Sequence, residues 1–309
     1  MHYDVPLAVP QPVEIAVIIP VYNDGDRLEL CLEALANQTL DSSRFHIVAV
    51  DNGSSTPPTH LVGRYANFTL LHESKPGSYS ARNKALANIK ADYYAFTDAD
   101  CIPSHQWLEQ ALQTLTQPGI DAVGGAVSIF CADPNQPTAI EILDVIKAFP
   151  QRTYVQTQHY AVTANLSMTA AAFEKTGRFN DELKSGGDKE WCRRLHAAGG
   201  VLVYSEAAEV AHPARATLIE HETKARRVAH GAYARRHTDP NTAKFVGWQG
   251  ILMGLMPPVR KGRVIWQQFN NQSSVLRLKA IGVYYYVNAY AAWQKIRCHL
   301  GLVKQAERS

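Results

Sequence analysis

The sequence predicts an α/β protein in which helices flank a mostly parallel, doubly wound sheet. Two near-continuous aliphatic segments, 14–21 (EIAVIIPV) and 46–51 (HIVAVD), end in polar residues, as strands buried on both faces do. Between them, apolar residues recur at i, i+3, i+4 and i+7 over residues 28–35, which is the spacing of one helix face. This order of strand, helix and strand is typical of a βαβ unit with a parallel sheet.

The same alternation continues along the chain. We expect a short strand over 69–71, a helix over about 79–89, a strand over 93–100, a helix around 107–115 and a strand over 122–130. The polar clusters YNDGD, DNGSS and TDADC lie where strands end. Because ligands bind at the carboxyl ends of the strands in such sheets, we expect the functional site there.

Beyond about residue 215 the pattern changes to helices that are basic or uncharged. Residues 216–237 have the pattern of a long basic helix, and segments 245–259 and 280–294 are each 15 residues long without a charge. Both segments are shorter than the 18 or more apolar residues that indicate a membrane span. We therefore expect an α/β domain over 1–215 and a C-terminal helical extension over 216–309.

The composition suits a folded protein with two regions of opposite charge. Of the 309 residues, 46% are hydrophobic and 19% are charged, which excludes a disordered or collagen-like chain. Residues 1–211 contain 15 Lys and Arg against 24 Asp and Glu, whereas residues 212–309 contain 16 against 4. The basic region could face the phosphate groups of a nucleic acid, of a membrane or of an anionic substrate.

Aromatic residues accompany the positive charge, and two explanations stay open. The uncharged segments either pack on the α/β domain or a second subunit, or lie in a membrane interface, with cations at anionic headgroups and rings at the boundary. The first twelve residues have neither the basic start nor the apolar stretch of a signal peptide, so we expect a cytoplasmic location. If the uncharged segments lie in a membrane interface, the protein would be peripheral at the inner face of the cell membrane. The aromatic residues concerned are Trp248, Trp266, Tyr284, Tyr285, Tyr286 and Trp293.

Two Asp-x-Asp patterns differ in their context. Asp98 and Asp100 follow the apolar segment YYAF, where two carboxylates repel each other and lose solvation. A divalent cation would relieve both costs, and oxygen ligands suit Mg²⁺ or Mn²⁺. Asp24 and Asp26 instead begin the first helix, where carboxylates cap free N–H groups or contact a nucleotide.

The loop residues at the other strand ends allow both a structural and a functional reading. Asp51 begins an Asn-Gly turn and could accept hydrogen bonds from a base or ribose. Lys75 and Arg82 flank a flexible loop that enters a helix, a place where phosphate binds well, although both are also typical surface residues. Neither a P-loop pattern nor a GxGxxG motif after the first strand is present.

Two further residues could take part in chemistry. Asp188 follows the pair Gly186-Gly187 at the start of a helix, where it could be an N-cap or a general base that a substrate can approach closely. His212 follows an apolar stretch and is either a structural histidine or a ligand. The five cysteines are far apart without a CxxC pair, which favours reduced thiols over a zinc site or disulfides.

The order of these motifs resembles that of the inverting family-2 glycosyltransferases, which have the GT-A fold, a Rossmann-like arrangement. VIIPVYND, VDNGSS, PGSYSARNKAL, FTDADC, FNDELKSGGDKEWCRRL and VAH follow one another over about residues 13–215 at the spacing of that family. The resemblance implies a catalytic domain over 1–215 that transfers a sugar from a nucleotide-diphosphate sugar, most commonly a UDP-sugar, with Mn²⁺ or Mg²⁺ as cofactor. The acceptor hydroxyl would belong to a lipid-linked or envelope glycan, as in polysaccharide biosynthesis.

The resemblance also implies a role for each matching residue. Asp188 would be the catalytic base, alone or with Glu190, because Gly187 stands where the family often has Glu. Lys75 stands where the family often has Asn, which makes that contact a departure from the pattern. The donor would contact Pro20, Tyr22, Asp51, Lys75, Gly77, Arg82 and Asp98, and the metal would be held by Asp98, Asp100 and His212.

Two other functions remain as alternatives. A sugar-phosphate nucleotidyltransferase has a similar sheet and metal requirement, although the glycine- and arginine-rich loop after the first strand is missing. A nucleic-acid-binding protein would explain the basic C-terminal region but would leave Asp98, Asp100 and Asp188 without a role, so we expect no nucleic acid partner. The Gln-x-x-Arg-Trp motif of processive synthases is also missing, which favours the addition of a single sugar.

Overall fold

The computed structural model describes residues 13–183, 185–237 and 240–302, so the first twelve residues, where we saw no signal peptide, lie outside the described part. The chain divides into two compact units. The first unit takes its described residues from Met1–Ser128, Phe149–Glu182 and Gly187–His212, and the second from Ile129–Ala148, Leu183–Gly186 and Pro213–Ser309. One boundary between the units falls at His212–Pro213, and the second unit also includes two segments from the middle of the chain, Ile129–Ala148 and Leu183–Gly186. The division into a domain over 1–215 and an extension over 216–309 stays a prediction.

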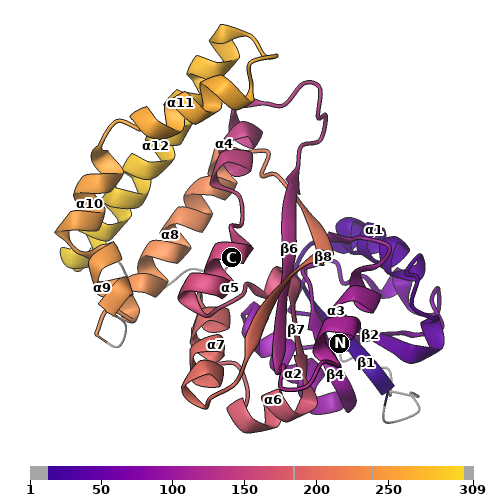
Figure 1. The fold of residues 1–309 in the computed structure, drawn as a ribbon. Helices are drawn as coiled ribbons and strands as arrows, with labels where there is room; N and C mark the ends of the chain where they lie inside the picture. The colour runs from indigo at the N-terminus through magenta and orange to yellow at the C-terminus, as the bar shows by residue number, and fades with distance from the viewer. Residues whose placement is uncertain (1–12, 184, 238–239, 303–309) are drawn as a thin grey trace. The chain divides into compact units, whose positions relative to one another are not determined.

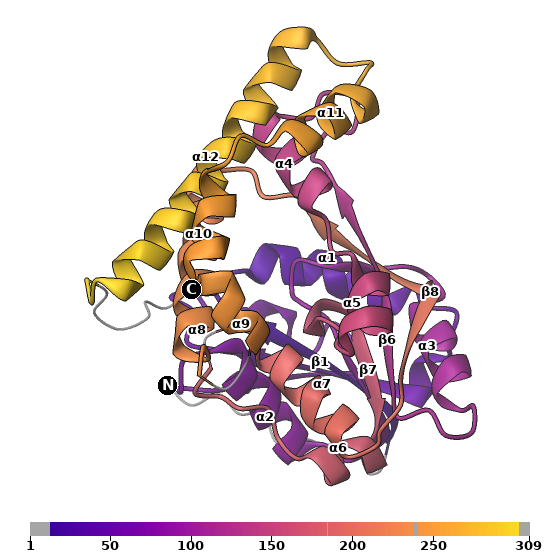
Figure 2. The same ribbon diagram turned by 60° about the vertical axis from the view of Figure 1, so that its left-hand side comes forward.

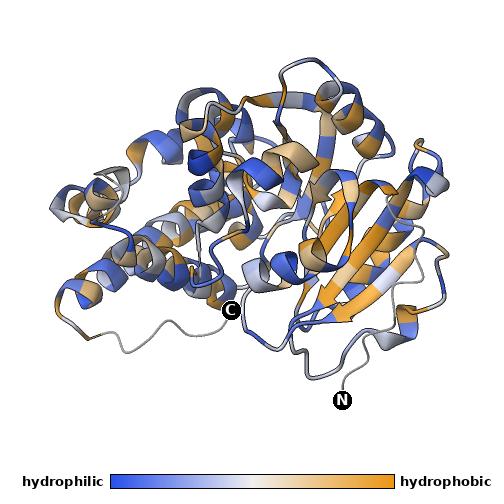
Figure 3. Ribbon diagram, turned by 90° about the horizontal axis from the view of Figure 1, so that it is seen from below, coloured by the Kyte–Doolittle hydropathy of each residue, from blue (hydrophilic) through white to orange (hydrophobic). Residues whose placement is uncertain are grey.

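The parallel strands expected from the sequence form one side of the sheet. β1 (Val13–Val21), β2 (Phe45–Asp51), β3 (Phe68–His72) and β4 (Ala91–Phe96) pair in parallel in the order β3-β2-β1-β4. Figure 3 shows strands that are hydrophobic along nearly their whole length. The α/β class and these strand positions are confirmed, and the carboxyl ends of β2 and β4 lie on the same edge of the sheet.

The other side of the sheet is antiparallel. β7 (Leu166–Thr169) runs antiparallel to β4, β6 (Ala122–Phe130) runs antiparallel to β7, and β5 (Ile102–Pro103) runs antiparallel to β8 (Leu202–Pro213). The described strands follow the order β3-β2-β1-β4-β7-β6-β8-β5. The sequence did not indicate β7, because four residues are too few to show a period, so the parallel arrangement ends at β4.

Two hydrophobic cores lie on the two faces of this sheet. α1 (Gly25–Ala36) and α3 (Trp107–Leu115) cover one face, and α2 (Ser78–Asn88), α6 (Ala170–Thr176) and α7 (Gly187–Ala197) contribute to the other. Figures 1 and 2 show these helices around the strands. Side chains of β1 alternate between the faces, because successive residues of a strand point to opposite sides. The helix predicted from residues 28–35 is α1, with all four apolar residues buried.

Several close contacts hold the antiparallel side together. α5 (Gln151–Gln158) packs Val155 into the second core. The buried Asn165 accepts a hydrogen bond from Trp107 Nε1 at 2.9 Å and donates from Nδ2 to the carbonyls of Ala126 and Ala208, both at 2.7 Å. A Cβ at Gly125 would lie 2.1 Å from the Ala208 carbonyl oxygen, so β6 requires glycine there.

The second unit is built from helices. α12 (Ser274–His299) packs along α8 (Leu218–Ala234) and α10 (Trp248–Leu255), and it also contacts α4 (Ala139–Lys147) and α11 (Val259–Gln268). A short helix, α9 (Pro240–Val246), precedes α10. Capping boxes at Thr138 and Thr217 begin α4 and α8, which satisfies backbone N–H groups that would otherwise be free.

The two uncharged segments form helices in this unit. The segment 245–259 contains α10, and the segment 280–294 lies inside α12. Among the described residues, no helix is both long and apolar enough to cross a membrane.

Candidate active site at the strand ends

Asp51 ends β2 and is completely buried. Its carboxylate accepts a hydrogen bond from the Ser54 backbone N–H at 3.3 Å, and His72 Nδ1 lies 3.4 Å from Asp51 Oδ2. The turn reading of this segment is therefore correct, and the carboxylate is at the strand end where a ligand site was expected.

Asn52 holds the loop that leads into α2. Its side-chain N–H groups donate to the backbone carbonyls of Glu73 and Lys75, at 2.9 and 2.8 Å, and its Oδ1 accepts from the Gly77 N–H at 2.6 Å. Gly77 has a φ of +131°, which a residue with a side chain rarely adopts. From the sequence, Asn52 is expected only to be part of a turn. Its neighbours in the sequence give no sign of hydrogen-bond partners more than twenty residues away.

The two basic residues of this loop have different surroundings. Lys75 Nζ donates to carboxylate oxygens of Asp181 and Glu182 at 2.8 and 2.6 Å. Arg82 is buried, with 2% of its surface exposed, and its Nη2 donates to Asp98 Oδ1 at 2.5 Å. Its guanidinium also lies 5.7 Å from the centre of the Tyr79 ring. The structure thus connects Arg82 to the first aspartate of the Asp-x-Asp pattern, whereas Lys75 pairs with two acidic residues at the end of the segment Phe149–Glu182 of the first unit.

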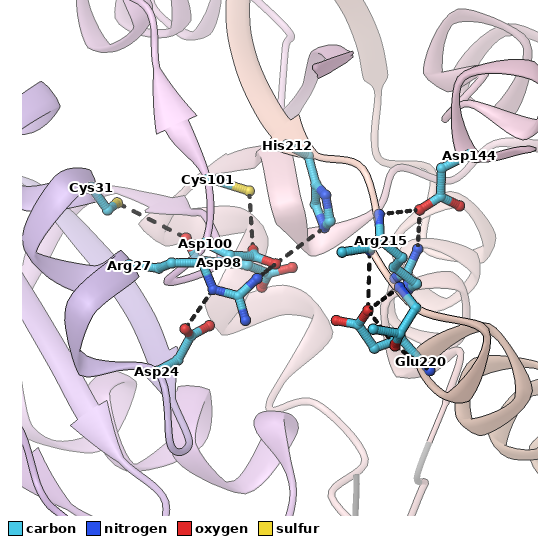
Figure 4. Close-up of polar contacts among 12 residues, drawn as sticks. Asp24, Arg27, Cys31, Asp98, Asp100, Cys101, Asp144, His212, Arg215 and Glu220 are labelled. Atoms are coloured by element: carbon cyan, nitrogen blue, oxygen red, sulfur yellow. Dashed lines mark hydrogen bonds and ion pairs between the residues drawn. The ribbon is translucent and has the colours of Figure 1, made fainter. Parts of the chain in front are cut away.

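The second aspartate of the pattern meets a histidine from the last strand of the sheet, as Figure 4 shows. His212 Nε2 lies 3.6 Å from Asp100 Oδ2, and Arg27 Nη1 lies 3.8 Å from the same oxygen. Cys101 Sγ is 3.8 Å from Asp100 Oδ1. The structure therefore brings together Asp100 and His212, which are 112 positions apart in the sequence.

The donor atoms of this cluster fit a divalent cation. The ligand atoms of Asp100, Cys101 and His212 all lie within 4.8 Å of one another. Carboxylate oxygen and imidazole nitrogen both suit Mn²⁺. Burial raises the pKa of the Cys101 thiol well above its usual value, and a soft sulfur ligand suits Mn²⁺ or Mg²⁺ less than carboxylate oxygen does. Asp98, also expected at the metal, accepts a hydrogen bond from Arg82, and its side chain is about one-third exposed.

Asp188 lies in the first turn of α7 against Tyr79. The Tyr79 hydroxyl donates to Asp188 Oδ1 at 3.3 Å, and the Lys189 backbone N–H donates to the same oxygen at 2.8 Å. Burial is the largest influence on the carboxyl and raises its pKa, while hydrogen bonds and the nearby Arg82 act in the opposite direction. A carboxylate with a raised pKa is a better proton acceptor than an exposed one.

The space around Gly187 accounts for glycine at this position, where the resemblance leads one to expect Glu before Asp188. A Cβ at Gly187 would lie 2.7–2.9 Å from three atoms of the Tyr79 ring, closer than real Cβ contacts. The Tyr79 ring therefore fills the space next to Asp188 that a side chain at position 187 would need. The contact of Tyr79 with Asp188 could not be predicted from the sequence, because the two residues are more than a hundred positions apart.

Glu190 pairs with a different residue from those that contact Asp188. Its carboxylate accepts from Arg194 Nε at 2.7 Å and from Arg194 Nη2 at 3.1 Å, a pair four residues apart on the face of α7. Residues two positions apart on a helix point in different directions, so Glu190 and Asp188 do not face each other. The contacts of Glu190 are those of a helix-stabilising ion pair.

The remaining candidates lie on or near the first strand. Pro20 is paired with Val50 near the end of β1, and Tyr22, which follows the strand, is 39% exposed. Asp24 precedes α1, but its side chain caps no backbone N–H group; it accepts instead from Arg27 Nε at 2.6 Å (Figure 4). The expectation that Asp24 caps the helix was therefore wrong, because a nearby arginine competes for its carboxylate.

A family model described as "Glycosyl transferase family 2" matches residues 16–177, slightly more than half of the chain. The chain belongs to glycosyltransferase family 2. The match includes the strand ends at Asp51, Asp98 and Asp100 and the loop into α2. It ends before Asp188 and His212, for which the structure gives the positions.

Two relatives are similar to this chain over well over half of its length. Glycosyltransferase AglE of Haloferax volcanii is 34% identical over 206 residues, which is 65% of this chain and 67% of AglE. Pre-mycofactocin glycosyltransferase of Mycobacterium tuberculosis is 29% identical over 80% of this chain. The aligned part spans only about half, 53%, of that relative.

Solved structures of glycosyltransferases have the same fold. Mannosyltransferase PcManGT from Pyrobaculum calidifontis, solved with GDP-Man and Mn²⁺, matches with a TM-score of 0.62 at 17% identity and covers 96% of this chain and 90% of its own. TarS of S. aureus matches with a TM-score of 0.55 at 18% identity, covering 95% of this chain and 93% of that structure. At such low identity these likenesses confirm the GT-A fold.

Proposed function

We propose that this glycosyltransferase transfers one sugar, with inversion, from a nucleotide-diphosphate sugar to a hydroxyl group of a lipid-linked or envelope glycan. The observation that carries the proposal is a connected set of side chains: Asp98 bonds to Arg82, Arg82 lies over Tyr79, and Tyr79 bonds to Asp188. This set links the carboxylate pattern expected to hold the donor with the carboxylate expected to accept a proton. Family membership favours sugar transfer over nucleotidyl transfer.

In this proposal the chain's own residues position the donor. Asp51, buried at the end of β2, would accept hydrogen bonds from the base or ribose, next to Pro20 and Tyr22. The loop fixed by Asn52 would present the Gly77 region and the N-terminus of α2 to the diphosphate. UDP is the nucleotide we propose, as the commonest in the family, and PcManGT with its bound GDP-Man makes GDP the alternative to test.

Asp100 and His212 are the residues that would hold a divalent cation, with Asp98 facing the ribose or the same ion. A cation held there supplies positive charge that stabilises the leaving nucleoside diphosphate. Mn²⁺ is the ion that we propose, because the carboxylate and imidazole are both suitable ligands and PcManGT was solved with Mn²⁺.

Asp188 would remove the proton from the acceptor hydroxyl as that oxygen attacks the anomeric carbon from the side opposite the leaving group. The new bond forms between the acceptor oxygen and the sugar, and the bond to the diphosphate oxygen breaks, which inverts the anomeric carbon. General-base catalysis of this kind contributes about 10²–10⁴-fold in rate.

A donor screen tests the proposal. The purified chain is incubated with Mn²⁺ and UDP- or GDP-sugars, and released nucleoside diphosphate is measured, with the product anomer determined by NMR. Asp188→Asn should lose turnover by about 10²-fold or more while keeping donor affinity. Glu190→Gln is the matched control and should keep most of the turnover, because Glu190 pairs with Arg194. Release of pyrophosphate, retention of the anomer, or near wild-type turnover of Asp188→Asn would contradict the proposal.

We further propose that the second unit binds peripherally to the surface of an anionic membrane. It is strongly basic, and Trp248, Met253 and Val259 of α10 and the start of α11 are each more than 70% exposed. Exposed apolar side chains beside many cations are what an interfacial anchor requires. Several other aromatic residues of the sequence argument have partners inside the unit, such as Tyr286 with Glu222 and Trp266 with Arg277.

Vesicle flotation tests this second part. The chain should float with anionic vesicles at low salt and much less with neutral vesicles. Trp248→Ser combined with Met253→Ser should reduce flotation several-fold, whereas Ile219→Ser on α8, also highly exposed, is the matched control and should not. Equal behaviour with neutral and anionic vesicles, or no effect of the α10 changes, would leave packing on another protein surface as the explanation.

A further inference from the structure

The second unit contains a cavity of about 640 Å³ that the proposed chemistry does not use. Residues of α4, α8, α9, α10 and α12 line it. Its volume is in the range of pockets that hold small organic ligands, which are mostly apolar with a few polar groups. Lysines predominate among its charged groups: the lining includes Lys147, Lys224, Lys244 and Lys295, besides the carboxylate of Asp144.

Among the described residues of the lining, Asp144 is the one carboxylate, and other groups of the second unit already contact it. Arg215 donates to Asp144 Oδ2 from its backbone N–H at 2.9 Å and from Nη1 at 3.0 Å, and His221 Nδ1 lies 3.9 Å from Oδ1 (Figure 4 shows the Arg215 contacts). The positive charge of Arg215 is enough to neutralise the negative charge of Asp144, so the lysines are additional positive charges. The cavity wall therefore carries an excess of positive charge.

This excess is costly because three of the four amines, those of Lys147, Lys224 and Lys295, are partly or largely withdrawn from water, whereas Lys244 is exposed. Burial lowers the pKa of Lys224 to about 7 and those of Lys147 and Lys295 to about 8. Lys295 is 4% exposed, and its ammonium donates to the Gly250 carbonyl at 3.2 Å and lies 3.7 Å from the centre of the Phe245 ring. An anion in the cavity would favour the charged form of these amines and remove part of the cost.

Apart from Gln249, Tyr284 and Asn288, much of the remaining lining is apolar, and it extends to the protein surface. Val228 and Val287 lie in the wall between α8 and α12, and Phe245 and Met253 line the cavity as well. Met253 is 73% exposed, so the cavity opens on the same exposed part of α10 that carries Trp248. A ligand that fits this lining has an anionic end and an apolar chain that leaves along α10.

We propose that this cavity binds a phosphate or diphosphate group that carries an apolar chain. Several compact ammonium groups suit an anion with more than one negative charge, since lysine binds phosphate as a point charge. Two sources have this chemistry: a phosphorylated lipid chain, and free phosphate or diphosphate that occupies the polar end alone. The apolar lining favours the first source, and the site goes beyond the sugar transfer proposed above.

Calorimetry with soluble probes tests the proposal on the full chain. Farnesyl diphosphate, inorganic diphosphate and farnesol are each titrated in EDTA, so that metal-dependent donor binding does not contribute. Farnesyl diphosphate should bind at least 10-fold more tightly than inorganic diphosphate, and farnesol should bind at least 10-fold more weakly than farnesyl diphosphate. Asp100→Ala should leave this binding unchanged, which separates the cavity from the donor site even if the chain transfers no sugar.

Lysine variants locate the binding. Lys224→Met should weaken binding of farnesyl diphosphate at least 10-fold, and Lys295→Met should act in the same direction. Lys279→Met is the matched control, because Lys279 is an exposed lysine of α12 away from the cavity, and should change affinity less than 2-fold. Lys224→Met should also raise the melting temperature of the ligand-free protein, which shows that it folds.

Each other result would overturn a stated part of the proposal. Binding that is unaffected by Lys224→Met, or equally tight binding of farnesol, would exclude an anion site among the lysines. Equal affinity for inorganic diphosphate would exclude the apolar chain and leave a site for free phosphate. A lower melting temperature of Lys224→Met, with affinity unchanged, would make the lysines a structural feature of the helix packing.

Discussion

Replacing Gly187 with alanine should destabilise the first unit through one identifiable contact. The new Cβ would lie 2.7, 2.8 and 2.9 Å from three atoms of the Tyr79 ring. That ring is buried and stacks on Phe179 at 5.9 Å between centroids, so it cannot move away freely. Because the φ of Gly187 is not positive, the cost comes from crowding and not from backbone strain.

The magnitude follows from the cost of overfilling a packed core. Inserting a methyl group without room costs about 1–3 kcal/mol. Removing the ring with Tyr79→Ala costs about 3–5 kcal/mol by itself, as for other large aromatic side chains. In the double variant the methyl group has room, so its added cost should be close to zero. The two changes should therefore couple by about 1–3 kcal/mol.

Urea unfolding of the four proteins in this double-mutant cycle measures the coupling. Gly282→Ala is the matched control, since a Cβ there meets nothing within 4 Å in the exposed part of α12. Alanine favours helix more than glycine does, so this control should be stabilised by about 0.5–1 kcal/mol. Gly187→Ala should also slow sugar transfer, because Tyr79 donates the hydrogen bond to Asp188.

The reasoning is refuted if Gly187→Ala is as stable as the wild type. It is also refuted if the effects of Gly187→Ala and Tyr79→Ala simply add, because additivity means that the two residues do not compete for the same space.

Three further predictions concern the metal, the loop and pH. Asp100→Ala should abolish Mn²⁺-dependent binding of nucleoside diphosphate in calorimetry, and unchanged affinity would remove Asp100 from the metal site. Asn52→Leu should raise the KM for the donor and make the loop before α2 more susceptible to proteolysis, since the variant loses three hydrogen bonds. An unchanged digestion pattern would show that the conformation of the loop does not depend on Asn52. The free energy of unfolding should increase from pH 7 to 9 in a buffer without phosphate, because burial lowers the pKa of Lys224 to about 7 and the unfolded state then binds more protons. One such group contributes at most about 1.4 kcal/mol per pH unit, and Lys224→Met should reduce this slope whereas Lys279→Met should not.

Much of the fold, and the position of three aspartates at the strand ends, could be predicted from the sequence. Long apolar segments bounded by polar clusters gave β1, β2 and β4 and placed Asp51, Asp98 and Asp100 at one edge of the sheet. These predictions succeed because hydrophobic periodicity and strand ends are local properties of a few consecutive residues. The antiparallel β7 has no such signal, since four residues do not define a period.

The sequence by itself determined the class of fold, the family and the residue types of the site. Only the tertiary structure decided that Arg82 meets Asp98 and that Tyr79 meets Asp188, and it shows His212 beside Asp100, as the family resemblance implied. It also decided that Glu190 pairs along its own helix and that lysines from four helices line one cavity. The physical reason is that side-chain hydrogen bonds and buried charges depend on distances between elements far apart in the chain, which local patterns of hydrophobicity do not encode.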